Sequence, residues 1–364
     1  MSVVGIIAEY NPFHKGHEYQ IQKIKELLHP DCIIAVMSGD FVQRGEPAIA
    51  NKYLRTKMAL EAGVDFVFEL PVLFASSASR DFAKAGVDIL HSLGCVDILC
   101  FGSEIGQLKP LEDVATILLE NHLDLKEQLK QGVSYPMARN HVLSGYLEYD
   151  SSLWTSPNNL LAIEYLQALK DTGIHPFTIK REGAYHDTDI RVPFASASAI
   201  RKFLLEGNSY EDIKPLNWEN FYNILCSKIL ENWEHLEDFK DVSKEIAGRI
   251  KKYFWQTCSV KELCDCIKNK QYTYTRIQRA LLHILLGIKK KMFYDPYIRL
   301  LGFRREKANL FKQMKCPIIT KLPKEPNTLL KLEIESSQLY EMVFKNTYNE
   351  RNLKNEYTQG IVLV

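Results

Sequence analysis

The sequence lacks a long apolar run, a paired-cysteine pattern and an excess of one charge. No window approaches the roughly 18 apolar residues of a membrane span. The first apolar run, Val3–Ala8, is too short for the core of a signal peptide and has no basic segment before it. None of the eight cysteines forms a C-x-x-C pair, so neither a zinc knuckle nor a disulfide framework is indicated. We therefore expect a cytoplasmic protein that has no membrane partner.

The composition is that of a globular protein stabilised by an apolar core. Apolar residues make up 46% of the chain and charged residues 25%. The length of 364 residues favours two domains, because single cores stop growing at about 250–300 residues. The net charge is only +1, and no internal repeat or low-complexity tract is visible. Composition therefore excludes no class of partner, and the local patterns have to indicate the function.

Up to about residue 205, short β-rich runs alternate with helical stretches. The expected strands are Val3–Ala8, Cys32–Met37, Phe66–Leu70, Val96–Phe101 and Phe177–Arg181. The expected helices are His17–Leu28, Tyr53–Ala62, Phe82–Leu93, Leu111–Asn121, Pro136–Ser144, Leu160–Lys170 and Ala199–Glu206. Strands that alternate with helices predict βαβ units and a parallel sheet with right-handed crossovers.

After residue 206 the strand signals nearly vanish and helical patterns dominate. The expected helices are Phe221–His235, Ser243–Tyr253, Val260–Lys268 and Arg276–Leu286. Residues 208–217 contain Pro215 and several turn formers, which is typical of a linker. We therefore predict an α/β domain over residues 1–207 and a mostly helical domain over residues 208–364.

The segment between the first strand and the first helix, Glu9–His17 (EYNPFHKGH), is the most informative part of the chain. Open parallel sheets bind ligands beyond the carboxyl ends of their strands, and a helix N-terminus offers free N–H groups to phosphate. His14 and His17 would donate hydrogen bonds to departing pyrophosphate, and Gly16 would let the backbone approach closely. The alternative is a chance H-x-G-H tetrad that only caps a helix. A metal site is less favoured, because no third ligand is at hand.

A second candidate phosphate site closes the α/β part. Ser196–Arg201 (SASAIR) places two hydroxyls and an arginine at the start of a helix. The free N–H groups there and the forked guanidinium of Arg201 suit a triphosphate. The alternative is a plain serine N-cap followed by a solvated arginine. Its pairing with the first motif on a parallel sheet favours the phosphate interpretation.

Together these motifs resemble the nucleotidyltransferase superfamily with the HIGH signature, and more closely the tRNA(Met) cytidine acetate ligase family. The segments that carry the resemblance are Ala8–His17 (AEYNPFHKGH), Ser38–Pro47 (SGDFVQRGEP), Phe68–Pro71 (FELP), Phe101–Glu104 (FGSE), Pro157–Tyr165 (PNNLLAIEY) and Ser196–Arg201. The C-terminal part resembles the family mainly through Arg276–Gly287 (RIQRALLHILLG). The resemblance implies a Rossmann-like nucleotidyltransferase domain with a parallel sheet, followed by a helical C-terminal domain.

The resemblance also implies a two-step reaction. Acetate and ATP would give acetyl-adenylate and pyrophosphate. The N4 amine of the wobble cytidine of elongator tRNA(Met) would then take the acetyl group and release AMP, giving N4-acetylcytidine. Adenylation is needed because a carboxylate is a poor acyl donor until its oxygen becomes part of a good leaving group. ATP is expected to bring Mg²⁺ through its phosphates, without a metal site built by the protein. No obligate protein partner is implied.

The residues and the resemblance together assign the nucleotide site. We assign to ATP binding Ile7, Ala8, Glu9, Tyr10, Asn11, Pro12, Phe13, His14, Lys15, Gly16, His17, Glu18, Tyr19, Gln20, Gly102, Asn158, Arg181, Ser196, Ser198 and Arg201. Three of them have simpler alternatives, namely a strand-exit turn for Gly102, a helix N-cap for Asn158 and a surface position for Arg181.

Catalytic roles are assigned to His14, His17 and Asp40. Asp40 would orient a base or assist proton transfer, and Arg44 beside it would contact acetate or a tRNA phosphate. A turn built by Ser38, Gly39 and Asp40 is the alternative.

A further candidate acid–base pair for the second step is His186 with Asp187, whose alternative is a solvent-facing pair.

Basic residues concentrate in the expected helical domain. Between Ile267 and Asn309, eleven Lys or Arg oppose only Asp295 and Glu306, so this segment carries +9 and the rest of the chain −8. Six aromatic residues interleave with the basic ones, namely Tyr272, Tyr274, Phe293, Tyr294, Tyr297 and Phe303. Such a pattern favours RNA, because cations neutralise phosphates and aromatic rings stack on unpaired bases. We assign to tRNA binding Arg276, Arg279, Lys289, Lys290, Lys291, Arg304 and Arg305; a solvated helical face is the alternative.

Two other functions compete with the RNA-modifying ligase. A small-molecule adenylyltransferase of the same superfamily would not need a basic helical domain. A non-catalytic RNA-binding protein with a degenerate nucleotide fold would not need the intact His14, Gly16 and His17.

Overall fold

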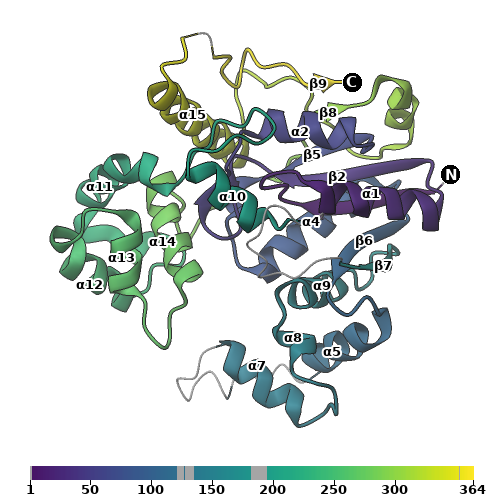
Figure 1. Cartoon of the computed structure of the whole chain (residues 1–364), viewed down its shortest axis with the longest axis horizontal. Coiled ribbons are helices and arrows are strands. Elements are labelled where there is room, and N and C mark those ends of the chain that lie inside the picture. The colour runs from purple at the N-terminus through teal and green to yellow at the C-terminus, as the bar shows by residue number, and fades with distance from the viewer. Residues whose placement is uncertain (1, 121–126, 128–134, 182–194, 352) are drawn as a thin grey trace.

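The computed structural model describes residues 2–120, 127, 135–181, 195–351 and 353–364. A seven-stranded sheet forms its centre, in the order β7-β6-β1-β2-β5-β8-β9 (Figure 1). Its strands are β1 (Val3–Ala8), β2 (Cys32–Ser38), β5 (Phe66–Leu70), β6 (Ile98–Ser103), β7 (His175–Lys180), β8 (Leu300–Phe303) and β9 (Val362–Leu363). The first five run parallel, whereas β8 pairs antiparallel with β5. The expected α/β fold with a parallel sheet is confirmed, with one antiparallel pairing added.

Helices cover both faces of this sheet. One face is covered by α1 (Lys15–Leu28) and α2 (Lys52–Glu61), which bury apolar side chains against β1 and β2. The other face is covered by α4 (Ser79–Leu93), α5 (Leu108–Glu120) and α9 (Pro157–Ala168). Strands β2 and β5 are buried along their whole length, as uninterrupted apolar runs between two helical layers require.

Shorter elements connect these layers. They are β3 (Phe41–Val42) and β4 (Glu46–Pro47), which form a small antiparallel ribbon, and α3 (Val72–Ala75), α7 (Tyr135–Ser144), α8 (Ser152–Thr155) and α10 (Ala197–Leu205). Side-chain caps fix where many helices begin: His14, Asn51, Ser196, Ser243, Ser259, Thr273 and Asn327 each accept a backbone N–H of the helix that follows. The helices expected before residue 206 are present, with ends within about three residues of those predicted.

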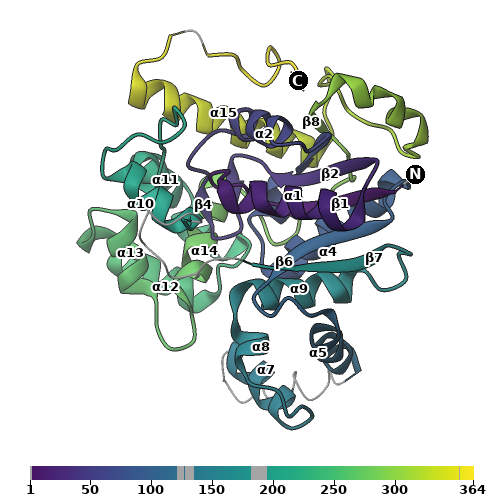
Figure 2. The same ribbon diagram turned by 45° about the vertical axis from the view of Figure 1, so that its right-hand side comes forward.

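The second half of the chain builds a helical lobe, which lies beside α10 in Figures 1 and 2. It consists of η1 (Trp218–Phe221), α11 (Tyr222–Glu231), η2 (Trp233–Asp238), α12 (Lys244–Tyr253), η3 (Phe254–Gln256), α13 (Val260–Ile267) and α14 (Tyr274–Leu286). A single apolar cluster joins these helices to α3 and to α15 (Thr328–Tyr348). Three of the four helices expected here are confirmed, and the fourth, Phe221–His235, is divided at Asn232 into α11 and η2.

The last third of the chain returns to the central sheet. Strands β8 and β9, the 3-10 segment η4 (Arg305–Gln313) and α15 were not predicted from the sequence. Strand β8 has four residues inside a basic segment, too few to show a strand period. The predicted domain boundary between residues 207 and 208 stays a prediction. The central sheet contains strands from both predicted domains, because β8 and β9 follow the boundary.

Candidate active site

The main cavity, of about 630 Å³, lies beyond the carboxyl ends of β1, β6 and β7. Ile7 and Ala8 line it from β1, Gly102 from β6, and Ile179 and Lys180 from β7. The chain proceeds from β1 to β2 and β5 on one side, and to β6 and β7 on the other. The cavity therefore occupies the switch point between β1 and β6, where doubly wound sheets bind nucleotides.

His14 and His17 lie together at the start of α1. His14 is the N-cap residue: its Nδ1 accepts the backbone N–H of Gly16 at 3.0 Å. The Nδ1 of His17 accepts the backbone N–H of His14 at 3.2 Å, which completes a capping box. A neutral imidazole that accepts at Nδ1 carries its proton on Nε2. Both rings line the cavity, so each offers an Nε2–H donor to a ligand there. The tetrad therefore caps helix α1, as the alternative expected, and it also places both histidines at the cavity.

Both imidazoles are kept neutral by their surroundings. Burial lowers the pKa of His14 to about 4, and the nearby Arg181 and Arg201 add to this effect. Burial also lowers the pKa of His17 well below its ordinary value, helped by His14 and Arg181. At neutral pH the two rings are therefore hydrogen-bond donors without charge, and the guanidinium groups supply the positive charge of the site.

The second motif meets the first at the cavity. Ser196 caps α10 by accepting the N–H of Ala199 at 3.1 Å. Arg201 donates from Nη1 to the carbonyl oxygen of Asn11 at 2.7 Å and from Nη2 to the hydroxyl of Ser198 at 3.2 Å. Arg201 is therefore held against the loop before α1, not solvated as the alternative required.

The segments FGSE and PNN also meet, at the wall formed by β6 and α9. The carboxylate of Glu104 accepts the side-chain N–H of Asn158 at 2.7 Å and its backbone N–H at 3.1 Å. The side-chain oxygen of Asn158 in turn accepts from Nη1 of Arg181 at 3.2 Å. Gly102 lies within β6, and a Cβ there would approach Cγ of Arg181 to 3.1 Å. Gly102 and Asn158 thus position Arg181 along the cavity, and its side chain is also exposed, so the cavity position and the surface alternative both apply.

Four of the residues assigned to ATP do not line the cavity. Pro12 and Phe13 are buried behind it, with the Phe13 ring 5.5 Å from that of His17, and Lys15 and Glu18 are exposed. Other residues that were not assigned to ATP also line the cavity. They are Gln43, Arg44, Ser79, Phe82, Phe101, Thr155, Pro157, Leu160, Leu161, Tyr165, Ile179, Lys180, Ala195, Ala197, Thr275 and Arg279. No spacing signal marks Phe82, Phe101 or Tyr165, which look in sequence like ordinary core positions. His186 and Asp187 lie outside the described residues.

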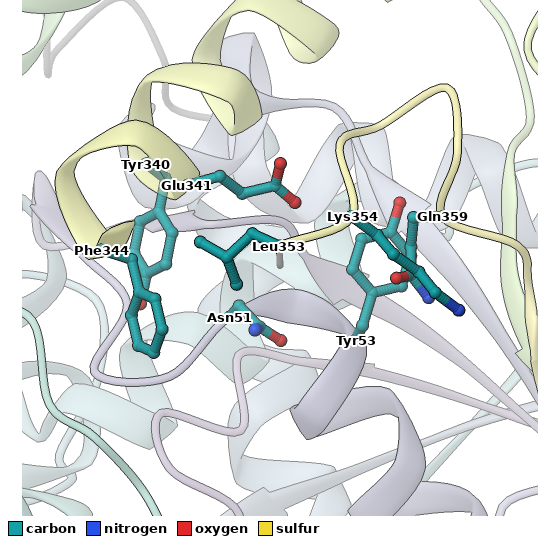
Figure 3. Close-up of a pocket in the computed structure, with 8 residues that line it drawn as sticks. All are labelled: Asn51, Tyr53, Tyr340, Glu341, Phe344, Leu353, Lys354 and Gln359. Carbon is teal, nitrogen blue, oxygen red and sulfur yellow. The ribbon is translucent and has the colours of Figure 1, made fainter. Parts of the chain in front are cut away.

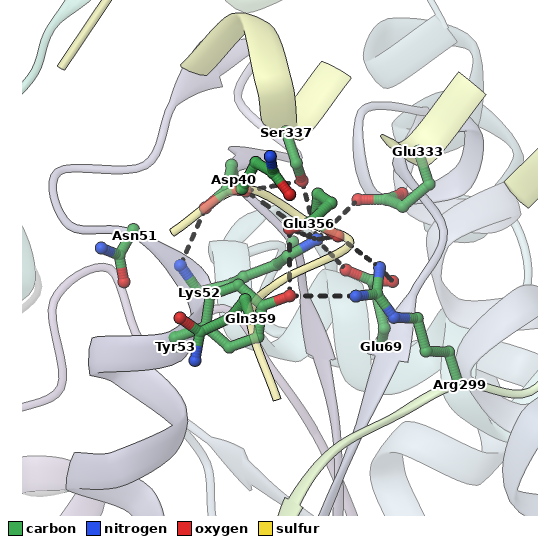
Figure 4. Close-up of polar contacts among 12 residues, drawn as sticks. Asp40, Asn51, Lys52, Tyr53, Glu69, Arg299, Glu333, Ser337, Glu356 and Gln359 are labelled. Atoms are coloured by element: carbon green, nitrogen blue, oxygen red, sulfur yellow. Dashed lines mark hydrogen bonds and ion pairs between the residues drawn. The ribbon is translucent and has the colours of Figure 1, made fainter. Parts of the chain in front are cut away.

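Asp40 does not line this cavity. It belongs to a buried ionic cluster formed by Asp40, Lys52, Glu69, Arg299, Glu333, Ser337 and Glu356 (Figure 4). The carboxylate of Asp40 accepts the backbone N–H of Lys52 at 2.8 Å and the hydroxyl of Ser337 at 2.7 Å. Burial raises the pKa of Asp40, although Lys52 and Arg55 oppose this effect. Its two oxygens thus face protein groups, not a ligand space.

Two cations hold the buried ionic cluster together. The Lys52 ammonium lies 2.6 Å from Glu69 and 3.2 Å from Glu356, and Arg299 lies 2.6 Å from Glu356. Burial acts to raise the pKa of Glu356, but Lys52 and Arg299 hold it below its ordinary value. Burial raises the pKa of Glu333 well above the ordinary value, and Glu69 adds to this. The cluster therefore joins the C-terminal segment to α2 and β5.

Arg55 connects this cluster to the cavity. Its side chain is fully buried and donates to the carbonyl oxygens of Glu9 at 2.6 Å, Ser38 at 3.0 Å and Ala50 at 2.9 Å, and also to that of Gly39. Glu9 lines the cavity, and Ser38 and Gly39 directly precede Asp40. One guanidinium thus fixes the backbone of both loops, a role that the sequence did not indicate.

A second, smaller cavity of about 300 Å³ lies between the start of α2, helix α15 and the C-terminal segment (Figure 3). Its lining residues are Asn51, Tyr53, Tyr340, Glu341, Phe344, Leu353, Lys354 and Gln359, none of which lines the first cavity. Burial raises the pKa of Glu341 to about 8, and Asp40 and Glu356 add to this shift.

The residues assigned to tRNA do not form one patch. Lys290, Lys291 and Arg305 are exposed. The Lys289 ammonium lies 3.6 Å above the ring of Phe239, and the Arg276 guanidinium lies 5.0 Å from that of Tyr272.

Two other arginines assigned to tRNA are paired with carboxylates. Arg279 lines the main cavity and lies 3.5 Å from Asp241. Arg304 pairs with Glu306 at 2.7 Å and Asp65 at 3.8 Å, next to β8. The fold therefore divides the basic segment between the helical lobe and the sheet edge.

Among the residues that the structure describes, no helix is long and apolar enough to cross a membrane. Within the same residues, no group of three or more His, Cys, Asp or Glu side chains is arranged to hold a metal ion.

Comparisons with known proteins agree with this geometry. The family model described as HIGH Nucleotidyl Transferase matches residues 1–356. A Thermoanaerobacter sp. (strain X514) protein named tRNA(Met) cytidine acetate ligase is 42% identical over 389 residues, covering 95% of this chain and 96% of its own. The protein of that name from Acetivibrio thermocellus is 38% identical over 416 residues and covers 100% of both chains.

Solved structures show the same relationship. The crystal structure of Thermotoga maritima TmcAL bound with alpha-thio ATP matches this chain with a TM-score of 0.88 and 30% identity, covering 100% of both chains. The apo form of that protein gives a TM-score of 0.90 and 31% identity. The chain therefore belongs to the HIGH nucleotidyl transferases and, within them, to the tRNA(Met) cytidine acetate ligase family.

Proposed function

We propose that this protein is an ATP-dependent acetate ligase that forms acetyl-AMP and acetylates the N4 amine of the wobble cytidine of elongator tRNA(Met). The observation that carries the proposal is the convergence of two neutral Nε2–H donors and two guanidinium groups on one cavity at the switch point of the sheet. The names of the relatives and the ATP analogue bound to the Thermotoga maritima protein support it.

The cavity walls suit the parts of ATP. His14 and His17 would donate to phosphoryl oxygens, and Arg181 and Arg201 would balance the charge that develops on pyrophosphate as it departs. The rings of Phe82, Phe101 and Tyr165 form an apolar wall that suits the adenine base. ATP would bring Mg²⁺ on its phosphates, since the described part of the chain has no ligand group for a metal of its own.

In the second step, the cytidine amine would attack the acetyl carbonyl of acetyl-AMP. The new C–N bond forms, the C–O bond to the phosphate breaks, and AMP leaves while the amine loses a proton. An unpaired anticodon base reaches the cavity at low cost, because it needs no duplex to be opened. Asp40 takes no direct part in this step, because its carboxylate is bonded to Lys52 and Ser337 away from the cavity.

We further propose that residues 1–207 hold the nucleotide and that residues 208–364 supply most of the tRNA contacts. Arg279 and Thr275 on α14 line the nucleotide cavity, so this helix would place RNA next to the adenylate. Lys290 and Lys291 follow the same helix and are exposed, which suits contacts to phosphate.

The test is to incubate the protein with ATP, labelled acetate and total tRNA. We expect label on tRNA(Met) only, in N4-acetylcytidine, with one AMP released for each acetyl group transferred. A tRNA(Met) with uridine at the wobble position should accept no label but still permit acetyl-AMP formation. Label that stays on a small molecule in every reaction would instead indicate an adenylyltransferase with a small substrate.

A further inference from the structure

The loop between α14 and β8 presents one aromatic side chain almost wholly to solvent. Phe293 is 94% exposed, the largest exposure among the large hydrophobic residues that the structure describes. The other aromatics of the basic segment differ from it. Tyr272 and Tyr297 are buried, and Phe303 stacks on Phe66 with ring centroids 5.7 Å apart. One exposed apolar side chain is common on protein surfaces, so a function for this ring depends on the charged residues beside it in the chain.

The neighbours of Phe293 hold it outward. Met292 packs against the apolar cluster of the helical lobe, and the Tyr294 ring lies edge-on to Phe74 in α3 at 5.4 Å. The start of the loop is also anchored, because the backbone N–H of Lys290 donates to the carbonyl oxygen of Asp238 at 2.8 Å. The ring therefore projects from a fixed backbone, and binding to it requires little ordering.

Three lysines, Lys289 to Lys291, precede this ring in the chain. Lys290 and Lys291 are exposed, and the Lys289 ammonium lies over the ring of Phe239. Within the described residues, no carboxylate lies at ion-pair distance from any of these three lysines, whereas Arg279 and Arg304 each pair with a carboxylate. An aromatic ring beside unpaired lysines matches the two parts of a single-stranded nucleotide, the base and the phosphate.

Helix α14 links this loop to the main cavity along the chain. Helix α14 brings Thr275 and Arg279 to the cavity and ends at Leu286, just before the lysines. The helical distance from Arg279 to Leu286 is about 10 Å at 1.5 Å per residue. An RNA strand that presents one base to the cavity can therefore pass along α14 to this loop.

We propose that Phe293 stacks on an unpaired base of the tRNA while Lys290 and Lys291 contact the flanking phosphates. This inference rests on the proposed function, because it assumes that the second substrate is RNA. It adds a contact with the face of one base to the electrostatic contacts with phosphate. It also selects an unpaired nucleotide over a duplex, because a base stacked within a duplex does not offer a free face.

The test compares variants for tRNA affinity at two salt concentrations. Phe293→Ala should weaken binding about fivefold or more without changing the salt slope, because stacking is lost but no charge is removed. Phe293→Trp should keep the affinity, and its indole fluorescence should change when tRNA binds. The double variant Lys290→Gln, Lys291→Gln should reduce the slope of log K against log salt concentration by about 1.4, because each phosphate contact of a single strand contributes about 0.7. Met137→Ala, which removes a 60% exposed apolar side chain from α7, is the matched control.

A second experiment identifies the stacked base. Anticodon stem-loops with one abasic position each are bound to the wild type and to Phe293→Ala. At the stacked position, removal of the base should abolish the difference between the two proteins.

The outcomes separate this inference from the proposed function. Wild-type affinity for Phe293→Ala in a protein that acetylates tRNA would overturn the stacking role alone. A protein that neither binds nor acetylates tRNA would overturn both proposals. Weakened binding by Phe293→Ala to every stem-loop, abasic or not, would show a contact to something other than a base and would also overturn the stacking role.

Discussion

The imidazole rings of His14 and His17 stack with their centroids 3.9 Å apart, while each Nδ1 accepts a backbone N–H of the same turn. This arrangement fixes the tautomer of both rings before any ligand arrives. It also divides each ring into a structural nitrogen, Nδ1, and a free donor, Nε2.

The two nitrogens of His17 can be tested separately. His17→Ala should raise the barrier to acetyl-AMP formation by about 2–4 kcal/mol, the cost of a lost transition-state donor. In His17→Asn the amide oxygen replaces Nδ1, so the cap should survive and the rate should fall as in the alanine variant. In His17→Gln the amide N–H replaces Nε2–H, so part of the rate should return. The rate of pyrophosphate release is measured for each variant. A near-normal rate in His17→Asn would show that the Nε2–H of His17 does not contribute to the reaction.

The depressed pKa of His14 has a direct spectroscopic test. Burial lowers this pKa from its ordinary 6.5 to about 4, so the ring signal of His14 should titrate near pH 4 in the ligand-free protein. Between these pH values the unfolded chain binds a proton that the folded chain does not bind, so the free energy of unfolding falls as the pH decreases from about 6.5 to about 4. NMR titration of the histidine ring protons measures the pKa, and the variant His14→Gln identifies which signal belongs to His14. A midpoint near 6.5 would contradict the buried neutral state.

The buried ionic cluster should depend strongly on Lys52. Lys52→Met leaves Glu69 and Glu356 buried with Arg299 alone, and should lower the free energy of unfolding by about 3–5 kcal/mol. Adding Glu69→Gln should restore part of this loss, because one buried charge is removed. Denaturant unfolding measures the free energy of unfolding of each variant. The matched control is Lys84→Met, which breaks an exposed ion pair with Asp88 and should cost less than about 0.5 kcal/mol.

Glu341 should make stability depend on pH in the opposite direction to His14. Its pKa in the folded protein is raised from 4.5 to about 8, so across this window the folded chain keeps a proton that the unfolded chain has lost. The free energy of unfolding therefore falls as the pH rises from about 4.5 to about 8. Glu341→Gln removes this titration and should gain stability relative to the wild type over the same window, with no further gain above it. The free energy of unfolding of wild type and variant, measured at pH 5, 7 and 9, shows whether stability falls as the pH rises. Glu335→Gln, at an exposed position of the same helix, is the control.

Acetyl-AMP formation should require Mg²⁺ supplied with ATP. Chelation of divalent cations should abolish pyrophosphate release, and added Mg²⁺ should restore it. Elemental analysis of chelator-washed protein should find no stoichiometric zinc. A tightly held zinc ion at one per chain would contradict a site that relies on the nucleotide for its metal.

Much of the fold and the central part of the site follow from the sequence alone. Uninterrupted apolar runs predict strands buried on both faces, and the HKGH tetrad marks the turn where β1 ends and α1 begins. These features are local: strand burial, helix caps and free N–H groups depend on residues a few positions apart. For this reason the five parallel strands β1, β2, β5, β6 and β7, the long helices between them and the position of His14 and His17 could be predicted.

Only the tertiary structure decided which distant residues meet. The ammonium of Lys52 bonds to Ser337 and Glu356, 285 and 304 residues away, and this long-range pairing fixes the environment of Asp40 that the local turn pattern could not indicate. In the same way, β8 joins the sheet through pairing with β5, and Arg279 reaches the nucleotide cavity from the helical lobe. Periodicity reports how much of a side chain is buried, but it contains no information on which partner buries it. The sequence therefore located the loop before α1, whereas the aromatic lining of the cavity, the buried surroundings of Asp40 and the division of the basic segment were determined by packing between segments far apart in the chain.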